Sequence, residues 1–138
     1  MVGIAHAGWR GLVGGVIEAT LAAMEVEPGE VLAWLGPAIG PASFEVGGEV
    51  RDAAIAAQSS AARAFAPCSP EKWLADLYAL ARLRLERAGV NSTRGGNFCT
   101  VHDAERFYSF RRDRITGRMA SLIWLAAPAI HDGLSCGD

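Results

Sequence analysis

The chain has 138 residues, of which 51% are hydrophobic and 20% charged, so one domain with a buried core is expected. Its formal net charge of −2 gives no long-range attraction to nucleic acid or to an anionic membrane, and no apolar run reaches the roughly 18 to 20 residues that span a bilayer. The three cysteines are odd in number and lack a Cys-x-x-Cys spacing, which favours reduced thiols and a cytoplasmic location over a disulfide scaffold.

The first part of the chain alternates strand-like and helix-like segments. Residues 2–5 form a short apolar run typical of a buried strand, and residues 11–24 repeat apolar side chains at helical spacing. Pro28-Gly29 ends that helix, and residues 31–35 predict a second strand. The Gly36–Pro41 loop that follows is expected to be rigid, because its prolines fix φ while its glycines permit unusual backbone conformations.

The rest of the chain is expected to change from helices to strands. A helix is predicted over residues 46–57. Ser69-Pro70 favours the start of another helix, which runs to Ala88 and ends at Gly89. The remaining regular segments are predicted to be three strands, the last two paired as a hairpin: residues 98–101, 107–110 and 118–125.

This order of elements predicts one α/β (α+β) domain, a sandwich built on a mixed β-sheet, over residues 1–126, followed by a loose tail over residues 127–138. Residues 2–5 have the composition of a central strand and yet open the chain, so we expect an N-terminally truncated sheet. An incomplete sheet leaves an open edge and apolar surface, through which self-association is expected.

His6 stands at the predicted turn from strand to helix and is the first candidate functional residue. Neutral imidazole is the commonest metal ligand and titrates near neutral pH, so His6 can be a metal ligand or a general base. The alternative is a histidine that only hydrogen-bonds a backbone carbonyl at the end of a strand. The next residues include no second His, Cys or carboxylate, so any further ligand must come from elsewhere in the fold.

Arg10 lies among the glycines at positions 8, 11, 14 and 15. A glycine-rich turn into a helix is typical of phosphate binding by free backbone N–H groups, and the guanidinium of Arg10 can hold a phosphate or a carboxylate as a fork. The spacing matches neither nucleotide-binding fingerprint. Tight packing of the turn, with Arg10 in solvent, is the alternative.

Two further groups of residues can carry chemistry. Cys99 and His102 offer a thiol and an imidazole as a nucleophile pair, although in a strand their odd separation would place them on opposite faces and leave an inert thiol. Arg111 and Arg112 follow the aromatic residues of segment 107–110 and precede a carboxylate. They indicate either an anion or nucleobase site or a structural Arg–Asp network, and both alternatives stay open.

Six motifs occur in order between residues 2 and 126: His6–Gly11, Trp34–Pro41, Phe44–Gly47, Cys99-Thr100, Phe107–Asp113 and Thr116–Ser121. In this combination they resemble the C-terminal portion of the multicopper polyphenol oxidoreductase (laccase-like) family, also called the zinc-dependent purine nucleoside phosphorylase family. The resemblance implies an α/β sandwich with mixed sheets, related to certain cysteine hydrolases and deamidating toxins.

The resemblance also implies a cytoplasmic enzyme that acts on purine nucleosides. Activities attributed to the family are phosphorolysis of adenosine, inosine, guanosine and methylthioadenosine, and deamination of adenosine, while the older laccase name implies copper. The family's zinc site uses two His and one Cys, and His6 matches the last of these histidines. The motifs that carry the other two ligands do not occur in this sequence. Cys99 matches a different cysteine of the family.

We therefore expect a purine nucleoside phosphorylase with adenosine deaminase activity, weak or inactive as this truncated chain, with purine nucleoside and phosphate as its ligands. His6 is expected to bind zinc, and Arg10, Arg111 or Arg112 to clamp phosphate. The sequence assigns no other catalytic residue. The alternatives are a non-catalytic fragment or binding module, a laccase-like polyphenol oxidase, and a cysteine hydrolase that uses Cys99 with His6 or His102.

Overall fold

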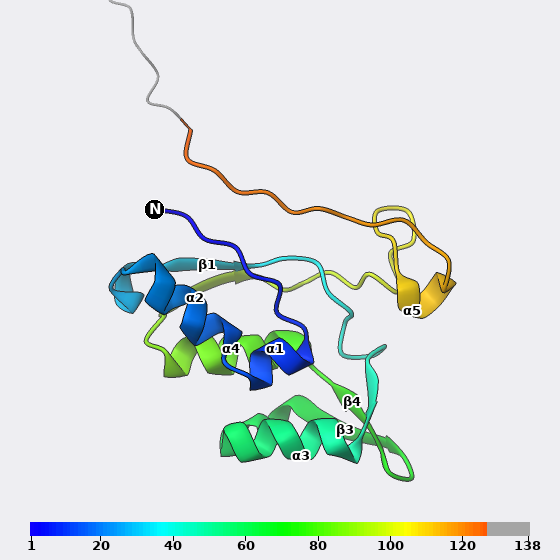
Figure 1. Cartoon of the computed structure of the whole chain (residues 1–138). Helices are drawn as coiled ribbons and strands as arrows, with labels where there is room; N and C mark the ends of the chain where they lie inside the picture. The colour runs from blue at the N-terminus through cyan, green and yellow to red at the C-terminus, as the bar shows by residue number, and fades with distance from the viewer. Residues whose placement is uncertain (127–138) are drawn as a thin grey trace, which may run out of the picture.

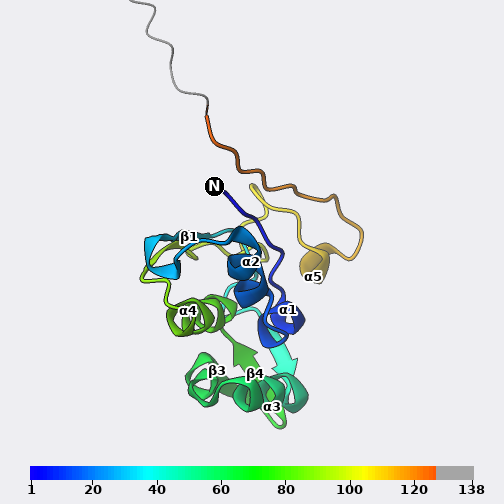
Figure 2. The ribbon, with the colours of Figure 1, turned by 60° about the vertical axis from the view of Figure 1, so that its left-hand side comes forward.

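The computed structural model describes residues 1–126, which are arranged in three tiers (Figure 1). The first tier is a pair of parallel strands, β1 (Leu32–Leu35) and β5 (Ser92–Gly95). A layer of helices lies beneath it, and a second, antiparallel sheet with one more helix lies beyond that layer. Figure 2 shows the same order of tiers after rotation. No helix of the described chain is long and apolar enough to cross a membrane.

The middle tier consists of α1 (Trp9–Val13), α2 (Val16–Met24) and α4 (Leu77–Arg87). The sequence predicts one helix over residues 11–24, and the structure breaks it at Gly14-Gly15. Gly15 has φ +85°, a left-handed conformation that glycine adopts without the steric cost of a Cβ. The break lets α1 turn its buried Leu12 toward the lower tier, while α2 packs on α4.

The lower tier is a three-stranded antiparallel sheet in the order β2-β4-β3, covered by α3. These elements are β2 (Glu45–Gly47), α3 (Gly48–Ala57), β3 (Phe65–Ser69) and β4 (Lys72–Ala75). The helix predicted over 46–57 is confirmed as α3. The helix start predicted at Ser69-Pro70 is wrong, because this dipeptide lies at the turn of the β3–β4 hairpin. The helix begins only at α4, where Asp76 accepts a hydrogen bond from the Ala79 N–H at 2.9 Å.

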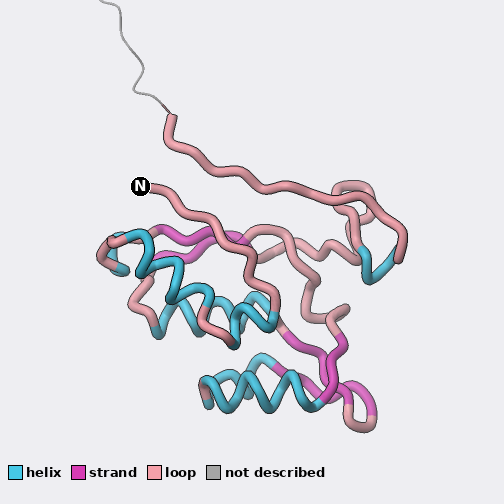
Figure 3. Tube along the Cα trace, in the orientation of Figure 1, coloured by secondary structure: helices cyan, strands magenta, loops and turns pink. Residues whose placement is uncertain are grey.

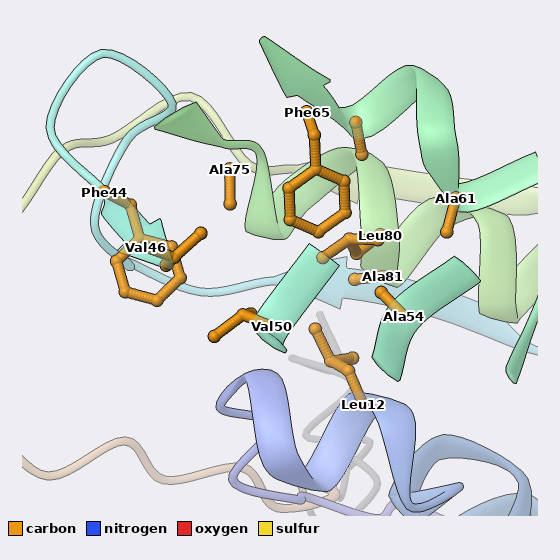
Figure 4. Close-up of a cluster of buried hydrophobic side chains, with 11 residues drawn as sticks. Leu12, Phe44, Val46, Val50, Ala54, Ala61, Phe65, Ala75, Leu80 and Ala81 are labelled. Atoms are coloured by element: carbon orange, nitrogen blue, oxygen red, sulfur yellow. The ribbon is translucent and has the colours of Figure 1, made fainter. Parts of the chain in front are cut away.

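The main hydrophobic core lies between the middle and lower tiers (Figure 4). Leu12 is 2% exposed and packs with α3 and α4 in one cluster of buried side chains, together with Phe65 of β3. A smaller cluster around Leu21, Leu85 and Val90 fills the space between the helices and the β1–β5 pair. Because α4 contributes to both clusters, it is the central element of the fold.

Several predicted strands are not strands in the structure. Residues 2–5, 98–101, 107–110 and 118–125 have no strand conformation, and the predicted hairpin does not form (Figure 3). Segment 99–107 turns on itself through hydrogen bonds from the Asp103 N–H to the Cys99 carbonyl and from the Phe107 N–H to the Asp103 carbonyl. The aromatic run ends in a short helix, α5 (Phe110–Asp113), capped by the Ser109 side chain.

The predicted α/β fold is confirmed, with one correction to its sheets. Parallel and antiparallel pairs both occur, but they belong to two separate sheets rather than to one mixed sheet. Strand β1 matches the prediction for residues 31–35, whereas the polar strand β5 was not predicted. The predicted tail over residues 127–138 lies outside the described residues.

The outer face of β1 carries large apolar side chains in solvent. Leu32 is 67% exposed and Trp34 61% exposed, whereas the neighbouring residues Ala33 and Leu35 pack inward. Figures 1 and 2 place the N-terminal residues and the extended segment 115–126 on this same side of the molecule. Segment 115–126 is also rich in exposed apolar residues, among them Ile115, Leu122 and Trp124.

Candidate functional site

Three motif-bearing loops meet at one place in the structure, which we call the loop cluster: Gly36–Pro41, Cys99–His102 and Ser109–Asp113. The Thr100 N–H donates to the Ala38 carbonyl at 2.9 Å, which joins the first two loops. Arg112 joins the second and third loops. Residues more than sixty positions apart in the sequence are therefore held within hydrogen-bond distance.

Tyr78 of α4 anchors the loop cluster from below. Its hydroxyl accepts a hydrogen bond from the Ala38 N–H at 2.7 Å and donates one to the Phe98 carbonyl at 3.0 Å. The side chain is buried, and burial raises the pKa of Tyr78 above its ordinary value. A neutral hydroxyl that both donates and accepts thus fixes both loops to the central helix.

Arg112 holds the loop cluster from the other side. Its guanidinium donates to the carbonyls of Thr100, Val101 and Phe107 at 2.9, 3.1 and 3.0 Å. It also binds both carboxylate oxygens of Asp113, which raises the pKa of Arg112 and lowers that of Asp113. All the N–H donors of the guanidinium are therefore bonded to protein oxygens. This geometry favours the structural Arg–Asp network, and phosphate binding by Arg112 stays a prediction.

Cys99 lies against Gly40, and the contact explains the glycine. The Gly40 N–H donates to the Cys99 sulfur at 3.2 Å, and a Cβ built on Gly40 would stand only 3.0 Å from the Cys99 Cβ. Gly40 has no positive φ, so its role is to leave space rather than to permit an unusual backbone. The sequence predicted that the glycines of this loop permit unusual backbone conformations. At Gly40 the glycine is instead required by the close contact with Cys99.

Ser43 connects Cys99 to His102. The Cys99 thiol donates to the Ser43 Oγ at 3.7 Å, and the Ser43 Oγ lies 2.9 Å from the His102 Nε2. The expectation that Cys99 and His102 point to opposite faces is wrong, because the segment is a turn and both side chains contact the same serine. The Ser43 hydroxyl therefore links the thiol to the imidazole through two hydrogen bonds.

Arg10 and Arg111 are both exposed, in contrast to Arg112. The Arg10 guanidinium lies over the Trp9 ring, 4.5 Å from its centroid. Arg111 reaches back from α5 to β2, where it donates to the Glu45 carbonyl at 3.3 Å and lies over the Phe44 ring. Both guanidinium groups thus lie at the surface, and the bond to the Glu45 carbonyl occupies one donor of Arg111.

His6 lies in the N-terminal segment 1–8, apart from the contacts of the loop cluster. It is exposed, and its Nε2 lies 3.5 Å from the position of a Cβ on Gly8. Within residues 1–126, no three side chains of His, Cys, Asp or Glu are close enough to hold a metal ion. His6 has the chemistry of a zinc or copper ligand, but the described residues do not complete a site for either metal.

A groove of about 430 Å³ lies elsewhere, between α2 and the end of α4. Glu18, Arg84 and Arg87 line it, and the Arg84 Nε pairs with the Glu18 Oε1 at 2.8 Å. None of its lining residues belongs to the six motifs. The groove therefore lies apart from the residues that the motifs identify.

The family model for multi-copper polyphenol oxidoreductase laccase matches residues 1–126. The chain belongs to this family. Among curated relatives, it is 58% identical over 125 residues to "Purine nucleoside phosphorylase PA4543" of Pseudomonas aeruginosa and 55% identical over 124 residues to "Purine nucleoside phosphorylase YfiH" of Escherichia coli K12. Each alignment covers 90% of this chain and 52% or 51% of the relative.

The family fold is also found among solved structures. The crystal structure of protein NMB0706 of Neisseria meningitidis superposes with a TM-score of 0.78 at 55% identity, over 79% of this chain and 45% of that one. The chain thus spans about half the length of the relatives that it matches.

Tyr78 and Ser43, which bind the loop cluster, are the residues that sequence reasoning missed. Tyr78 belongs to none of the six motifs, although a hydroxyl on the buried side of a helix needs a hydrogen-bond partner. That requirement is the signal that could have found it. Ser43 carries no such signal, because its role depends on two residues that are far away in the sequence.

Proposed function

We propose that this chain forms part of a purine nucleoside phosphorylase that cleaves adenosine, inosine, guanosine or methylthioadenosine with inorganic phosphate. The observation that supports this most strongly is the 58% and 55% identity, over 90% of the chain, to relatives whose names state that activity. The loop cluster adds support, because it holds four of the chain's motifs together in one place.

The proposed reaction exchanges one bond for another at the ribose. A phosphate oxygen forms a bond to C1′ while the bond from C1′ to the purine nitrogen breaks. The purine leaves with that electron pair and takes up a proton, and the other product is ribose 1-phosphate, or methylthioribose 1-phosphate when methylthioadenosine is cleaved. Phosphate must be held against C1′ throughout, so positioned guanidinium groups lower the barrier.

We assign the phosphate to the exposed arginines Arg10 and Arg111 rather than to Arg112. Arg–phosphate pairs are frequently bidentate, with two parallel N–H donors. The donors of Arg112 are occupied within the loop cluster, whereas Arg10 and Arg111 are exposed, and Arg111 uses one donor for the Glu45 carbonyl. Arg10 also lies four residues after His6, in the same motif.

His6 is proposed as a zinc ligand on the strength of the resemblance. Among the described residues, no group of three potential metal ligands includes this imidazole. We therefore assign no step of the reaction to zinc, nor to the copper of the older family name. Adenosine deamination and a cytoplasmic location belong to the same proposal and depend on the same resemblance.

A chimera tests the proposed function. Residues 1–126 of this chain would replace the aligned segment of the P. aeruginosa relative, and release of hypoxanthine from inosine would be followed with and without phosphate. We expect release that requires phosphate and is lost by more than about 100-fold in the His6→Ala chimera, since even groups that only orient a metal ligand contribute 10- to 100-fold. The isolated chain is expected to be weak or inactive in the same assay.

Arginine variants of the chimera locate the phosphate. Arg111→Ala and Arg10→Ala should raise KM for phosphate by about 10- to 100-fold, because a hydrogen bond to a charged group contributes about 1.5 to 3 kcal/mol. Arg63→Ala is the matched control, since Arg63 is also an exposed arginine, pairs with Glu86 and lies outside the six motifs. A folded chimera without phosphate-dependent release would leave the non-catalytic module as the better interpretation.

A second candidate function is the oxidation of polyphenols, which the description of the matching family model favours. The two reactions differ in their second substrate, because phosphorolysis consumes phosphate and laccase chemistry consumes oxygen. Oxygen uptake by the chimera with a catechol substrate and added copper distinguishes them. Uptake that is abolished by His6→Ala, without phosphate-dependent purine release, would favour the laccase.

A further inference from the structure

We propose that Cys99 is a modification site, a nucleophilic thiol that Ser43 and His102 activate toward soft electrophiles, and toward peroxides in particular. The proposed phosphorolysis gives these side chains no role, so the inference goes beyond the proposed function and does not depend on it. Its basis is the cluster of a thiol, a hydroxyl and an imidazole that the fold brings together from two separate loops.

The three side chains form a directed chain of hydrogen bonds. The thiol donates to the Ser43 Oγ at 3.7 Å, and the Ser43 hydroxyl can donate in turn to the His102 Nε2 at 2.9 Å. This requires the neutral His102 tautomer with its hydrogen on Nδ1. The proton of the thiol can therefore pass through the hydroxyl to the imidazole, which leaves a thiolate on Cys99 and a cation on His102.

Backbone donors stabilise the thiolate that this transfer creates. Burial opposes ionisation and is the largest single effect, but hydrogen bonds from the His102 backbone, the Gly40 N–H and the Ser43 hydroxyl outweigh it together. They hold the pKa of the Cys99 thiol below its ordinary value. The close approach of Gly40 is essential here, because a Cβ at that position would push Cys99 away from the donor.

The charged groups around Cys99 do not oppose this ionisation strongly. Asp103, which follows in the same turn, is paired with Arg106, and Asp113 of α5 is paired with Arg112. Tyr78 of α4 is held neutral by burial. Arg112 places its positive charge against the carbonyls of Thr100 and Val101, directly after Cys99 in the chain. The thiolate therefore faces one adjacent cation, His102, and carboxylates that are already paired.

The reaction with a peroxide balances within these groups. The thiolate sulfur attacks one peroxide oxygen, so a sulfur–oxygen bond forms and the oxygen–oxygen bond breaks. Sulfur is oxidised by two electrons and the peroxide is reduced. The departing hydroxide takes the proton from the His102 cation through Ser43 and leaves as water, and Cys99 becomes a sulfenic acid.

Alkylation of the full 138-residue chain by iodoacetamide, resolved by peptide mass mapping, tests the activation. Cys68 is the internal control, because it is an exposed free thiol on β3, outside the loop cluster. At pH 6.5 we expect Cys99 to react about tenfold faster than Cys68 despite its lower exposure, with the difference narrowing toward pH 9. A Cys99 rate equal to or below the Cys68 rate at pH 6.5 in the folded chain overturns the proposal.

Ser43 variants test the relay. Ser43→Ala should slow the alkylation of Cys99 at pH 6.5 by about three- to tenfold, and Ser43→Thr, which keeps the hydroxyl, should restore it. Ser59→Ala, at an exposed serine of η2 (Ser59–Ala64), is the matched control. An unchanged rate in a folded Ser43→Ala chain rules out the relay. If Ser43→Ala does not fold, as judged by circular dichroism, the relay is tested by comparing the alkylation rate of Cys99 in Ser43→Thr with that in the parent.

Hydrogen peroxide with dimedone trapping tests the modification itself. We expect the dimedone adduct at Cys99 before any at Cys68, and a slower adduct in His102→Gln, which cannot accept and return the proton. Equal trapping at both cysteines, or trapping that His102→Gln leaves unchanged, contradicts the proposed site.

Discussion

The loop cluster and the N-terminal segment 1–8 carry comparable motifs and differ in how the chain holds them. In the loop cluster, Tyr78 and Arg112 bind backbone groups of several loops. In segment 1–8, His6 is exposed, and no hydrogen bond of its side chain occurs among the described residues. The difference teaches that a motif identifies residues able to do chemistry, whereas the contacts show whether this chain positions them by itself.

Replacing Arg112 should destabilise the loop cluster more than any of the substitutions that follow. Arg112→Met removes the donors to the carbonyls of Thr100, Val101 and Phe107 and leaves Asp113 without its cation. We expect the melting temperature to fall by more than about 5 °C, the largest change among these predictions. Arg111→Met, which loses a single hydrogen bond, is the control in the same calorimetric scan. Equal melting temperatures for both variants would show that Arg112 does not hold the loops.

Tyr78→Phe removes one hydroxyl from the base of the loop cluster. The variant loses a donor and an acceptor in a buried position, and we expect a loss of about 1 to 3 kcal/mol in the free energy of unfolding, measured in urea at pH 8. The other tyrosine of the chain, Tyr108, is 55% exposed, so Tyr108→Phe is the matched control. The expected loss there is close to zero. Equal losses in the two variants would show that the Tyr78 hydroxyl does not anchor the loops.

The same tyrosine predicts a pH dependence. Burial raises the pKa of Tyr78 in the folded chain above that in the unfolded chain. The stability from the neutral hydroxyl is therefore fully present below the unfolded pKa, about 10, and is lost as the pH rises through the folded value. The parent should lose stability above pH 10 more steeply than Tyr78→Phe. Parallel stability curves for the two proteins contradict this assignment.

Trp34→Ser should change association rather than stability. The indole is 61% exposed on the outer face of β1, so its loss should alter the free energy of unfolding by no more than about 0.5 kcal/mol. The exposed face is expected to promote self-association, and the variant should shift sedimentation toward the monomer. A parent that sediments as a monomer at every concentration tested would contradict this expectation.

His6→Ala in the isolated chain should have the smallest effect. The side chain is exposed and outside both buried clusters, so the free energy of unfolding should stay within about 0.5 kcal/mol of the parent. The contrast with the large loss of activity expected for the same substitution in the chimera sharpens the difference between the two regions. A marked loss of stability would mean that this chain already holds His6 in place.

The sequence predicted those elements whose signal is local. Strand β1, helix α3 and the end of α4 follow from apolar spacing and from Gly89, which has φ +88°. The β3–β4 hairpin was missed, because Leu74 continues the apolar spacing of α4 and pairing across the turn is not visible locally. The strand predicted over 98–101 failed because hydrogen bonds to distant loops stabilise a turn there instead.

The residues of the candidate site were predicted better than their geometry. Cys99, His102 and Arg112 all stood out by residue type and spacing. Their arrangement depends on Tyr78 and Ser43, common residues whose partners lie far along the chain, so no local pattern could reveal it. His6 stands out as a metal-capable residue of its motif, and its role as a ligand stays a prediction.

Amide hydrogen exchange tests most directly whether this chain completes the loop cluster by itself and leaves segment 1–8 open. The Gly40 and Thr100 amides, which bond the Cys99 sulfur and the Ala38 carbonyl, should exchange at least about 100-fold more slowly than the amides of residues 3–7. Equal, rapid exchange in both regions would contradict a complete loop cluster, and equal, slow exchange would contradict an open N-terminal segment.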